Sequence, residues 1–224
     1  MSETTITVRG TASDWFDAER ATVTIRVGFE GPKREPVFES TARVGAEVTA
    51  AFAELEASGA VTRWSSDRVS VWSNRPWNNE GKRLPPVYHA ALTATARFQD
   101  FDALAALVER FATTDGVTIN SIEWDLTEER RLAVTSDIQT RAVQDATVKA
   151  TTYARAAGLT TVTALSIADP GMLENSGTPE AGFGGPARRG AAMMAMDASG
   201  GGELTFTPDR IQVSATVDAR FRAS

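Results

Sequence analysis

The chain has 224 residues, a single histidine, no cysteine and a net charge of −6 at pH 7. The absence of thiols excludes disulfides, cysteine nucleophiles, iron–sulfur clusters and cysteine-ligated zinc. The acidic balance, with no sustained run of Lys and Arg, argues against nucleic-acid binding, because phosphate contacts need a basic surface. The opening "MSETTITVRG" lacks signal-peptide features, and no window approaches the ~20 apolar residues of a membrane span, so we expect a cytoplasmic protein.

The first elements show strand and then helix periodicity. Residues 5–10 and 20–29 alternate apolar and polar side chains, and the turn residues between them predict a hairpin-like pair. Apolar residues then recur at steps of three and four from Val37 to Leu55 and predict an amphipathic helix. Gly59 follows as a plausible cap, because glycine tolerates the left-handed conformation.

A second strand pair carries most of the tryptophans. Residues 61–71 predict a strand, residues 73–86 a long polar turn, and Tyr88–Phe98 an antiparallel return strand. Trp64 and Trp72 differ by an even number, so an unbroken strand would place both on one face.

The second half continues with mixed elements. The patterns predict a helix that Asp100 caps, that runs through Phe111 and that ends before Gly116. A strand over Val117–Leu126 follows, and then a long Ala-rich helix over Glu128–Ala157 that Gly158 terminates. The last predicted elements are a strand over Thr161–Ala168 and a strong strand over Ile211–Phe221.

Residues 169–202 are rich in Gly, Pro, Ala, Ser and Met and show no helix or strand period. We therefore expect a flexible insertion before the last strand, with a short helix over 187–196 as an alternative. Its side chains Met193, Met194 and Met196 form a candidate contact surface, because methionine adapts its shape to a partner. The alternative is a segment that stays mobile.

Strands and helices mixed in this order predict an α+β fold: an antiparallel or mixed β-sheet with amphipathic helices packed on it, in a single domain over residues 1–224. A doubly wound α/β fold is not expected.

The only imidazole, His89, is a candidate general base near neutral pH, and the alternative is a strand residue at the sheet surface. No GxSxG elbow, EF-hand loop or HExxH motif accompanies it. We therefore expect no catalytic residue, no cofactor and no metal site. A small-molecule or hydrolase-like site using His89 and Tyr88 remains the alternative.

Trp72, Arg75 and Trp77 stand at or near the tip of the predicted hairpin. Trp and Arg are enriched in interface hot spots, so these three residues are a candidate interface with a partner subunit.

Four segments carry a resemblance to a known family. They are "ITVRGTASDWFDAERATVTIRV", "VYHAALTATARFQDFDALAALVERFATTDGVTINSIEWDL", "RAVQDATVKATTYARAAGLTTVTALSIAD" and "IQVSATVDARF". In this order they resemble the SIMPL-domain family, named for a signalling molecule that associates with a mouse pelle-like kinase. Its bacterial members are largely uncharacterised, and many are periplasmic. The chain departs from the family in reading "FDAERA" where members often have Pro-Asp.

Some family members look like ring- or channel-shaped oligomers, so the resemblance implies a homo-oligomer here. We therefore expect a non-enzymatic protein that acts through self-assembly or through binding a protein partner. Unpaired sheet edges and the long hairpin would be suitable joints.

Overall fold

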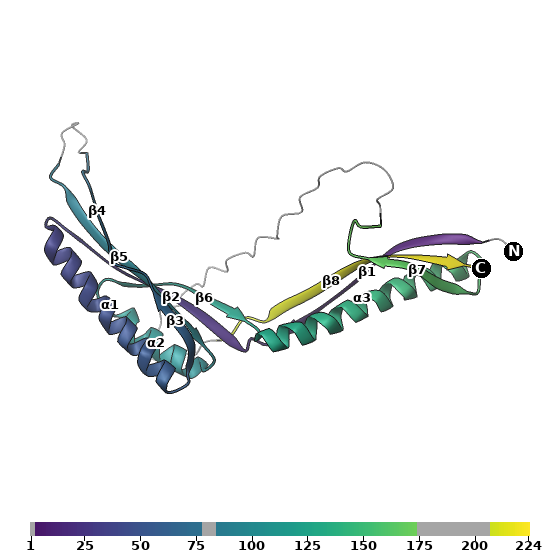
Figure 1. Ribbon diagram of the computed structural model, residues 1–224, viewed down its shortest axis with the longest axis horizontal. Coiled ribbons are helices and arrows are strands. Elements are labelled where there is room, and N and C mark those ends of the chain that lie inside the picture. Colours follow the sequence, from purple (N-terminus) through teal and green to yellow (C-terminus); the bar gives the residue numbers. More distant parts are fainter. Residues whose placement is uncertain (1–2, 78–83, 174–206) are drawn as a thin grey trace. The chain divides into compact units, whose positions relative to one another are not determined.

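The computed structural model describes residues 3–77, 84–173 and 207–224. The candidate residues Met193, Met194 and Met196, the alternative helix over 187–196 and most of the expected insertion lie outside these residues. The fold is α+β, with strands in antiparallel sheets (Figure 1). We expected a single domain over residues 1–224, and within it the contacts form two compact units.

The first of these, the five-stranded unit, lies within residues 17–127 with a short later segment. Its sheet has the order β3-β5-β2-β6, and β4 also pairs with β5. The elements are β2 (Arg20–Gly31), α1 (Arg34–Ala57), β3 (Val61–Ser66), β4 (Ser70–Asn74), β5 (Val87–Phe98), α2 (Phe101–Ala112) and β6 (Val117–Asp125).

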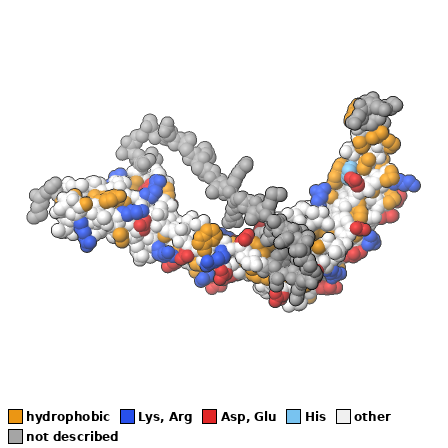
Figure 2. Space-filling model, turned by 180° about the vertical axis from the view of Figure 1, so that it is seen from behind, with side chains coloured by type: hydrophobic (Ala, Val, Ile, Leu, Met, Phe, Trp, Pro, Cys, Tyr) orange, Lys and Arg blue, Asp and Glu red, His pale blue; other side chains and the backbone are white. Residues whose placement is uncertain are grey.

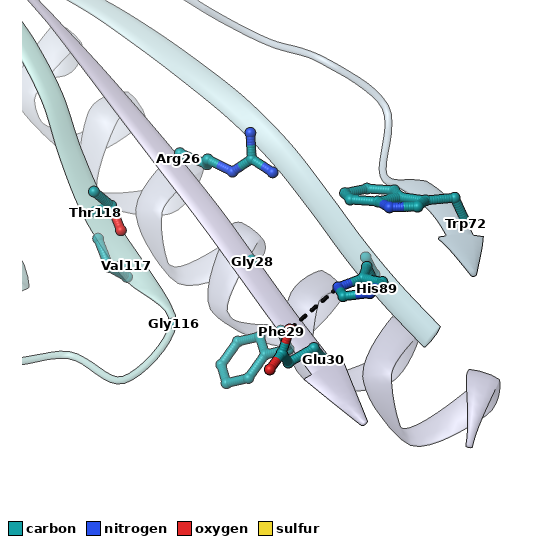
Figure 3. A pocket seen from close by; sticks show the side chains of 10 residues that line it. Arg26, Gly28, Phe29, Glu30, Trp72, His89, Gly116, Val117 and Thr118 are labelled. Atoms are coloured by element: carbon teal, nitrogen blue, oxygen red, sulfur yellow. Dashed lines mark ion pairs between the residues drawn. The ribbon is translucent and has the colours of Figure 1, made fainter. Parts of the chain in front are cut away.

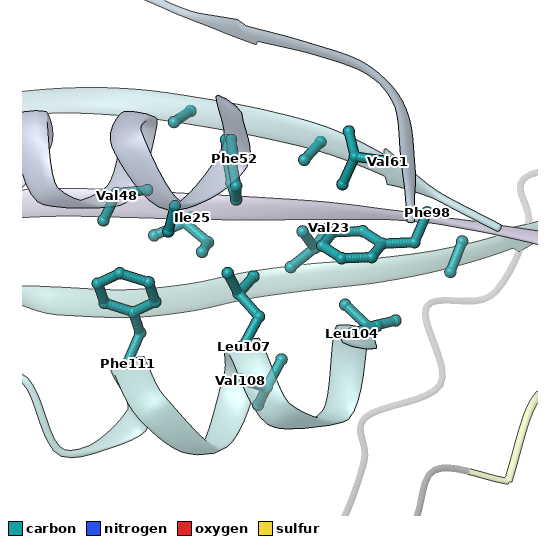
Figure 4. Close-up of a cluster of buried hydrophobic side chains, with 14 of the residues drawn as sticks. Val23, Ile25, Val48, Phe52, Val61, Phe98, Leu104, Leu107, Val108 and Phe111 are labelled. Atoms are coloured by element: carbon teal, nitrogen blue, oxygen red, sulfur yellow. The ribbon is translucent and has the colours of Figure 1, made fainter. Parts of the chain in front are cut away.

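One face of this sheet forms the core. Val23 and Ile25 of β2 lie opposite Ala96 and Ala94 of β5, and all four are buried. Both helices pack on this face, with side chains such as Phe52 of α1 buried against it (Figure 4). The buried members contributed by α2 are Leu104, Leu107, Val108 and Phe111. Because side chains alternate along a strand, the intervening residues of β2 and β5 point to the opposite, polar face.

Caps and turns predicted from the sequence are confirmed. The Asp100 carboxylate accepts hydrogen bonds from the backbone N–H groups of Asp102 and Ala103 at the start of α2. Gly59 and Gly158 both adopt positive φ, just beyond the ends of α1 and of the long helix α3 (Glu128–Ala156). None of the described helices combines the length and apolarity that crossing a membrane requires.

Two expectations about strands are wrong. The expected hairpin between 5–10 and 20–29 does not form, because the first strand extends to Phe16 and joins a different sheet from β2. The expected strand over 61–71 is two strands, β3 and β4, separated at residues 67–69. Both still pair antiparallel with β5, as the predicted return strand requires.

Because the strand is interrupted at residues 67–69, the prediction that Trp64 and Trp72 share one face of the sheet is also wrong. Trp64 lies opposite Ala96 and Trp72 lies opposite His89. These partners are an odd number of residues apart on β5, so the two indoles project from opposite faces. Trp64 packs against the core beside Phe52, whereas Trp72 is on the polar face.

The second, three-stranded unit has the strand order β1-β8-β7 and one long helix. Its elements are β1 (Thr4–Phe16), α3 (Glu128–Ala156), β7 (Val162–Ala168) and β8 (Ile211–Ala223). The Ala-rich stripe of α3 is buried against the sheet, although Tyr153 and Ala157, which the spacing also assigned to it, are exposed. The stripe consists of Ala142, Ala146, Ala150 and Ala154, and its partners include Ile6, Val8, Val217 and Phe221.

Candidate functional site

A hollow of about 370 Å³ lies on the polar face of the five-stranded unit (Figure 3). We call it the Gly28 hollow, because Gly28 leaves an open position in the middle of its floor. Its polar and aromatic walls come from four strands. They are Arg26 and Glu30 of β2, Trp72 of β4, His89 of β5 and Thr118 of β6, with Phe29, Ala90, Gly116 and Val117 completing the lining.

The sheet register brings Trp72, His89 and Glu30 into one row. Trp72 of β4 is opposite His89 of β5, and His89 is in turn opposite Glu30 of β2. The row forms because antiparallel neighbours on one face come within side-chain contact. Three strands therefore contribute to one cluster.

The imidazole of His89 contacts an oxygen through each ring nitrogen. Its Nε2 lies 2.9 Å from Oδ1 of Asn74, and its Nδ1 lies 3.3 Å from Oε2 of Glu30 (Figure 3). Only 20% of the His89 side chain is exposed, against 73% for Glu30. With an oxygen at both nitrogens, the ring is held in one orientation.

The indole of Trp72 stacks on the same imidazole. The ring centroids are 5.4 Å apart and the planes differ by 12°. The stack leaves 45% of Trp72 exposed. Figure 2 shows the imidazole in pale blue at the surface, with hydrophobic side chains in orange beside it. The hollow therefore combines an accessible aromatic wall with charged groups.

Within the described residues, the hydrogen-bonding and ion-pair partners recorded for the His89 ring are Asn74 and Glu30, and neither carries a hydroxyl that could serve as a nucleophile. Tyr88 follows the opposite parity on β5 and lines a separate open depression with residues 32–36 and Glu39. His89 and Tyr88, predicted to share a site, are thus on opposite faces.

The candidate interface residues divide into two groups. Trp72 lies within β4 and lines the Gly28 hollow. Arg75 and Trp77 follow the strand, and both are exposed, Trp77 by 65%.

Arg26, Gly28 and Glu30 were missed by the sequence analysis. The signal was present: Gly28 stands between two charged residues at the outward positions of an otherwise regular strand, "RVGFE". Glycine inside a strand often marks a place where a ligand or another backbone approaches closely.

The three-stranded unit contains a second polar cluster. The guanidinium of Arg9 donates to both carboxylate oxygens of Asp218, from Nε at 2.7 Å and from its terminal nitrogen at 3.0 Å. The backbone N–H of Gly171 donates to the same carboxylate at 2.8 Å. Hydrogen bonding from Arg9 makes the largest contribution to lowering the pKa of Asp218 below its ordinary value, and the bond from Gly171 adds to it. Asp218 therefore ties the turn after β7 to the sheet.

A comparison with known proteins identifies a family. The profile described as "SIMPL: Protein of unknown function (DUF541)" matches residues 6–221, nearly the whole chain and parts of both units. A search of curated proteins finds no match.

Proposed function

Because the chain belongs to the SIMPL family, whose function is unknown, we propose from its own structure that it acts without catalysis, by joining to a second copy through β7. The observation that carries the proposal is the composition of this edge strand. β7 is at one edge of the β1-β8-β7 sheet and reads "VTALSIA", with no charged residue and no proline.

Proteins usually protect an exposed strand edge with charge, proline or a bulge, because its free N–H and C=O groups pair readily with another chain. The opposite edge, β1, carries Arg9 and Asp14. β7 has only a register shift between Ala164 and Ser166. Leu165 and Ile167 are each 49% exposed there. Within the described part of the chain, the strand therefore offers both backbone groups and apolar area.

Antiparallel pairing of β7 with β7 of a second copy would follow a two-fold axis, the commonest symmetry of soluble homo-oligomers. It would extend the three-stranded sheet across both copies. The partner would cover Leu165 and Ile167, which adds apolar burial to the main-chain hydrogen bonds.

The test is the mass of the protein in solution, measured by size-exclusion chromatography with light scattering over a range of concentrations. We expect an assembled wild type and a monomeric Ile167→Lys variant, because an edge lysine opposes strand pairing. Val148→Lys is the matched control, since Val148 is 64% exposed on α3 and away from the edge. A monomeric wild type, or equal loss of mass in both variants, would contradict the proposal.

The exposure of Trp77 favours a second joint at the tip of the β4–β5 hairpin, formed with Arg75. The same mass measurement on Trp77→Ala tests it. A loss of assembly with β7 intact would assign a contact to the tip, and an unchanged mass would remove it.

A hydrolase-like role near His89 has less support. The ring nitrogens of His89 face Asn74 and Glu30, and Tyr88 points to the other side of the sheet.

A further inference from the structure

We propose that the Gly28 hollow binds a small carboxylate that carries a flat aromatic group. The argument is independent of the proposed self-assembly, since the hollow lies in the five-stranded unit and β7 in the three-stranded unit.

The first step concerns the glycine itself. A Cβ at position 28 would meet its nearest neighbours at ordinary contact distances, 3.5 Å from the Ala90 carbonyl oxygen and 3.7 Å from Cβ of Ala91. The backbone there is not among those with positive φ. Neither packing nor conformation therefore requires glycine, although glycine weakens a strand interior. What the missing side chain does is keep the hollow open.

The second step concerns Arg26. Its side chain is exposed and extends along the hollow toward Trp72 and His89 (Figure 3). Its Nε lies 3.8 Å from the position that a Cβ of Gly28 would occupy. Among the residues that the structure describes, no hydrogen bond or ion pair of this guanidinium is recorded. A planar guanidinium with free donors matches the two oxygens of a carboxylate.

The third step is the charge balance. Among the described residues of the wall the only carboxylate is Glu30, which lies 3.3 Å from Nδ1 of His89 and one outward position beyond Gly28 as seen from Arg26. Within the described residues Glu30 contacts His89 and not Arg26, so the Arg26 guanidinium can meet a ligand anion. A ligand cation would meet Arg26 unfavourably.

The fourth step is the aromatic wall. The Trp72–His89 stack holds the indole in place while leaving 45% of Trp72 exposed. A volume of about 370 Å³ is in the range of small-molecule sites. The combination favours a flat ring attached to the carboxylate.

The test uses 2-naphthoate as the probe, with binding to the full chain followed by ligand-observed NMR. We expect saturable binding with a dissociation constant of about 1 mM or below. Neutral 2-naphthamide and inorganic phosphate are comparison probes that lack the charge and the ring, respectively. Both should bind at least about tenfold more weakly.

Two variants locate the site. Arg26→Gln should weaken 2-naphthoate binding at least about tenfold, and Gly28→Val should abolish it by filling the hollow while suiting a strand. Arg63→Gln is the matched control, because Arg63 is an exposed arginine of β3 outside the hollow. Circular dichroism confirms that each variant is folded.

Three results would overturn the proposal. They are no saturation by 2-naphthoate, equal binding of 2-naphthamide, and equal effects of Arg26→Gln and Arg63→Gln. A monomeric protein that still binds 2-naphthoate through Arg26 would refute self-assembly alone.

Discussion

Gly10 of β1 lies directly against the backbone of α3 at Ala142. A Cβ on Gly10 would overlap the Ala142 carbonyl oxygen and come within 2.8 Å of Cβ of Ala146. The Ala stripe of α3 and this glycine together let the helix approach the strand closely. The three-stranded unit therefore depends on the absence of side-chain volume at this crossing.

Gly10→Ala should accordingly destabilise the protein by about 1–3 kcal/mol, because the helix or the strand must shift to admit a methyl group. Urea unfolding followed by circular dichroism measures the change. Gly28→Ala is the control, since its methyl group meets only ordinary contacts, and it should be neutral or slightly stabilising. Equal losses in the two variants would show that the close approach is not the cause.

A comparison of Gly116 with Gly59 distinguishes the cost of backbone strain from the cost of a steric clash. Gly116 adopts φ of 78°, and a Cβ there would overlap the ring of Phe29. Gly59 adopts φ of 84° with nothing within 4 Å of such a Cβ. Gly59→Ala should therefore cost only the left-handed strain, about 1–2 kcal/mol. Gly116→Ala should cost about 1–3 kcal/mol more in the same unfolding experiment.

The lowered pKa of Asp218 predicts a dependence of stability on pH. A carboxyl whose pKa is lower in the folded than in the unfolded state stabilises the fold fully above its unfolded pKa. With an ordinary value of 3.8, the contribution is complete above that pH and is lost as the pH falls below it. Urea unfolding between pH 6 and 3 should show a larger loss in the wild type than in Asp218→Asn. The variant keeps Asp145, whose pKa is also lowered, chiefly by the hydrogen bond from Lys149.

At neutral pH, Asp218→Asn should lower the free energy of unfolding by about 1–2 kcal/mol, because a neutral amide cannot accept both charged hydrogen bonds from Arg9. The loss is not larger, because Arg9 is itself 57% exposed and solvent screens the pair. Asp17→Asn provides the comparison. Asp17 also pairs with an arginine, Arg210, but is 90% exposed. A comparable loss in Asp17→Asn would show that burial of Asp218 is unimportant.

Trp64 and Trp77 should respond differently to truncation. Trp64 packs on the core near Phe52, and its indole N–H donates to Glu56 at 3.0 Å. Trp64→Ala should therefore lower the free energy of unfolding by about 2–4 kcal/mol. Trp77 is 65% exposed, so Trp77→Ala should change it by no more than about 0.5 kcal/mol. The reverse order would refute the difference in burial between Trp64 and Trp77.

Local periodicity in the sequence predicted most of the helices and strands, but it did not predict how the strands pair. Alternation located β2, β5 and β8, and spacing of three and four located α1, because each pattern reflects one buried face. The partner of β1 could not be found this way. It is β8, about 200 residues away in sequence. The turn-forming residues of "ASDWFDAE" suggested a local hairpin instead, but residues 12–16 of that segment belong to β1.

The candidate site was only partly foreseeable. His89 and Trp72 stood out by residue type, but their stacking depends on the register between β4 and β5 and on the break after β3. Arg26 and Glu30 looked like ordinary outward residues of a strand. Their common role at the hollow becomes visible only when Gly28 is placed between them on the folded sheet.

The order of strands in the three-stranded sheet has a consequence for synthesis on the ribosome. Its middle strand, β8, comes after every other described element in the chain. During synthesis β1 and β7 therefore remain unpaired until β8 has been made, whereas the elements from β2 to β6 are already available to fold. Emergence of β8 from the ribosome is thus the event that allows this sheet to close.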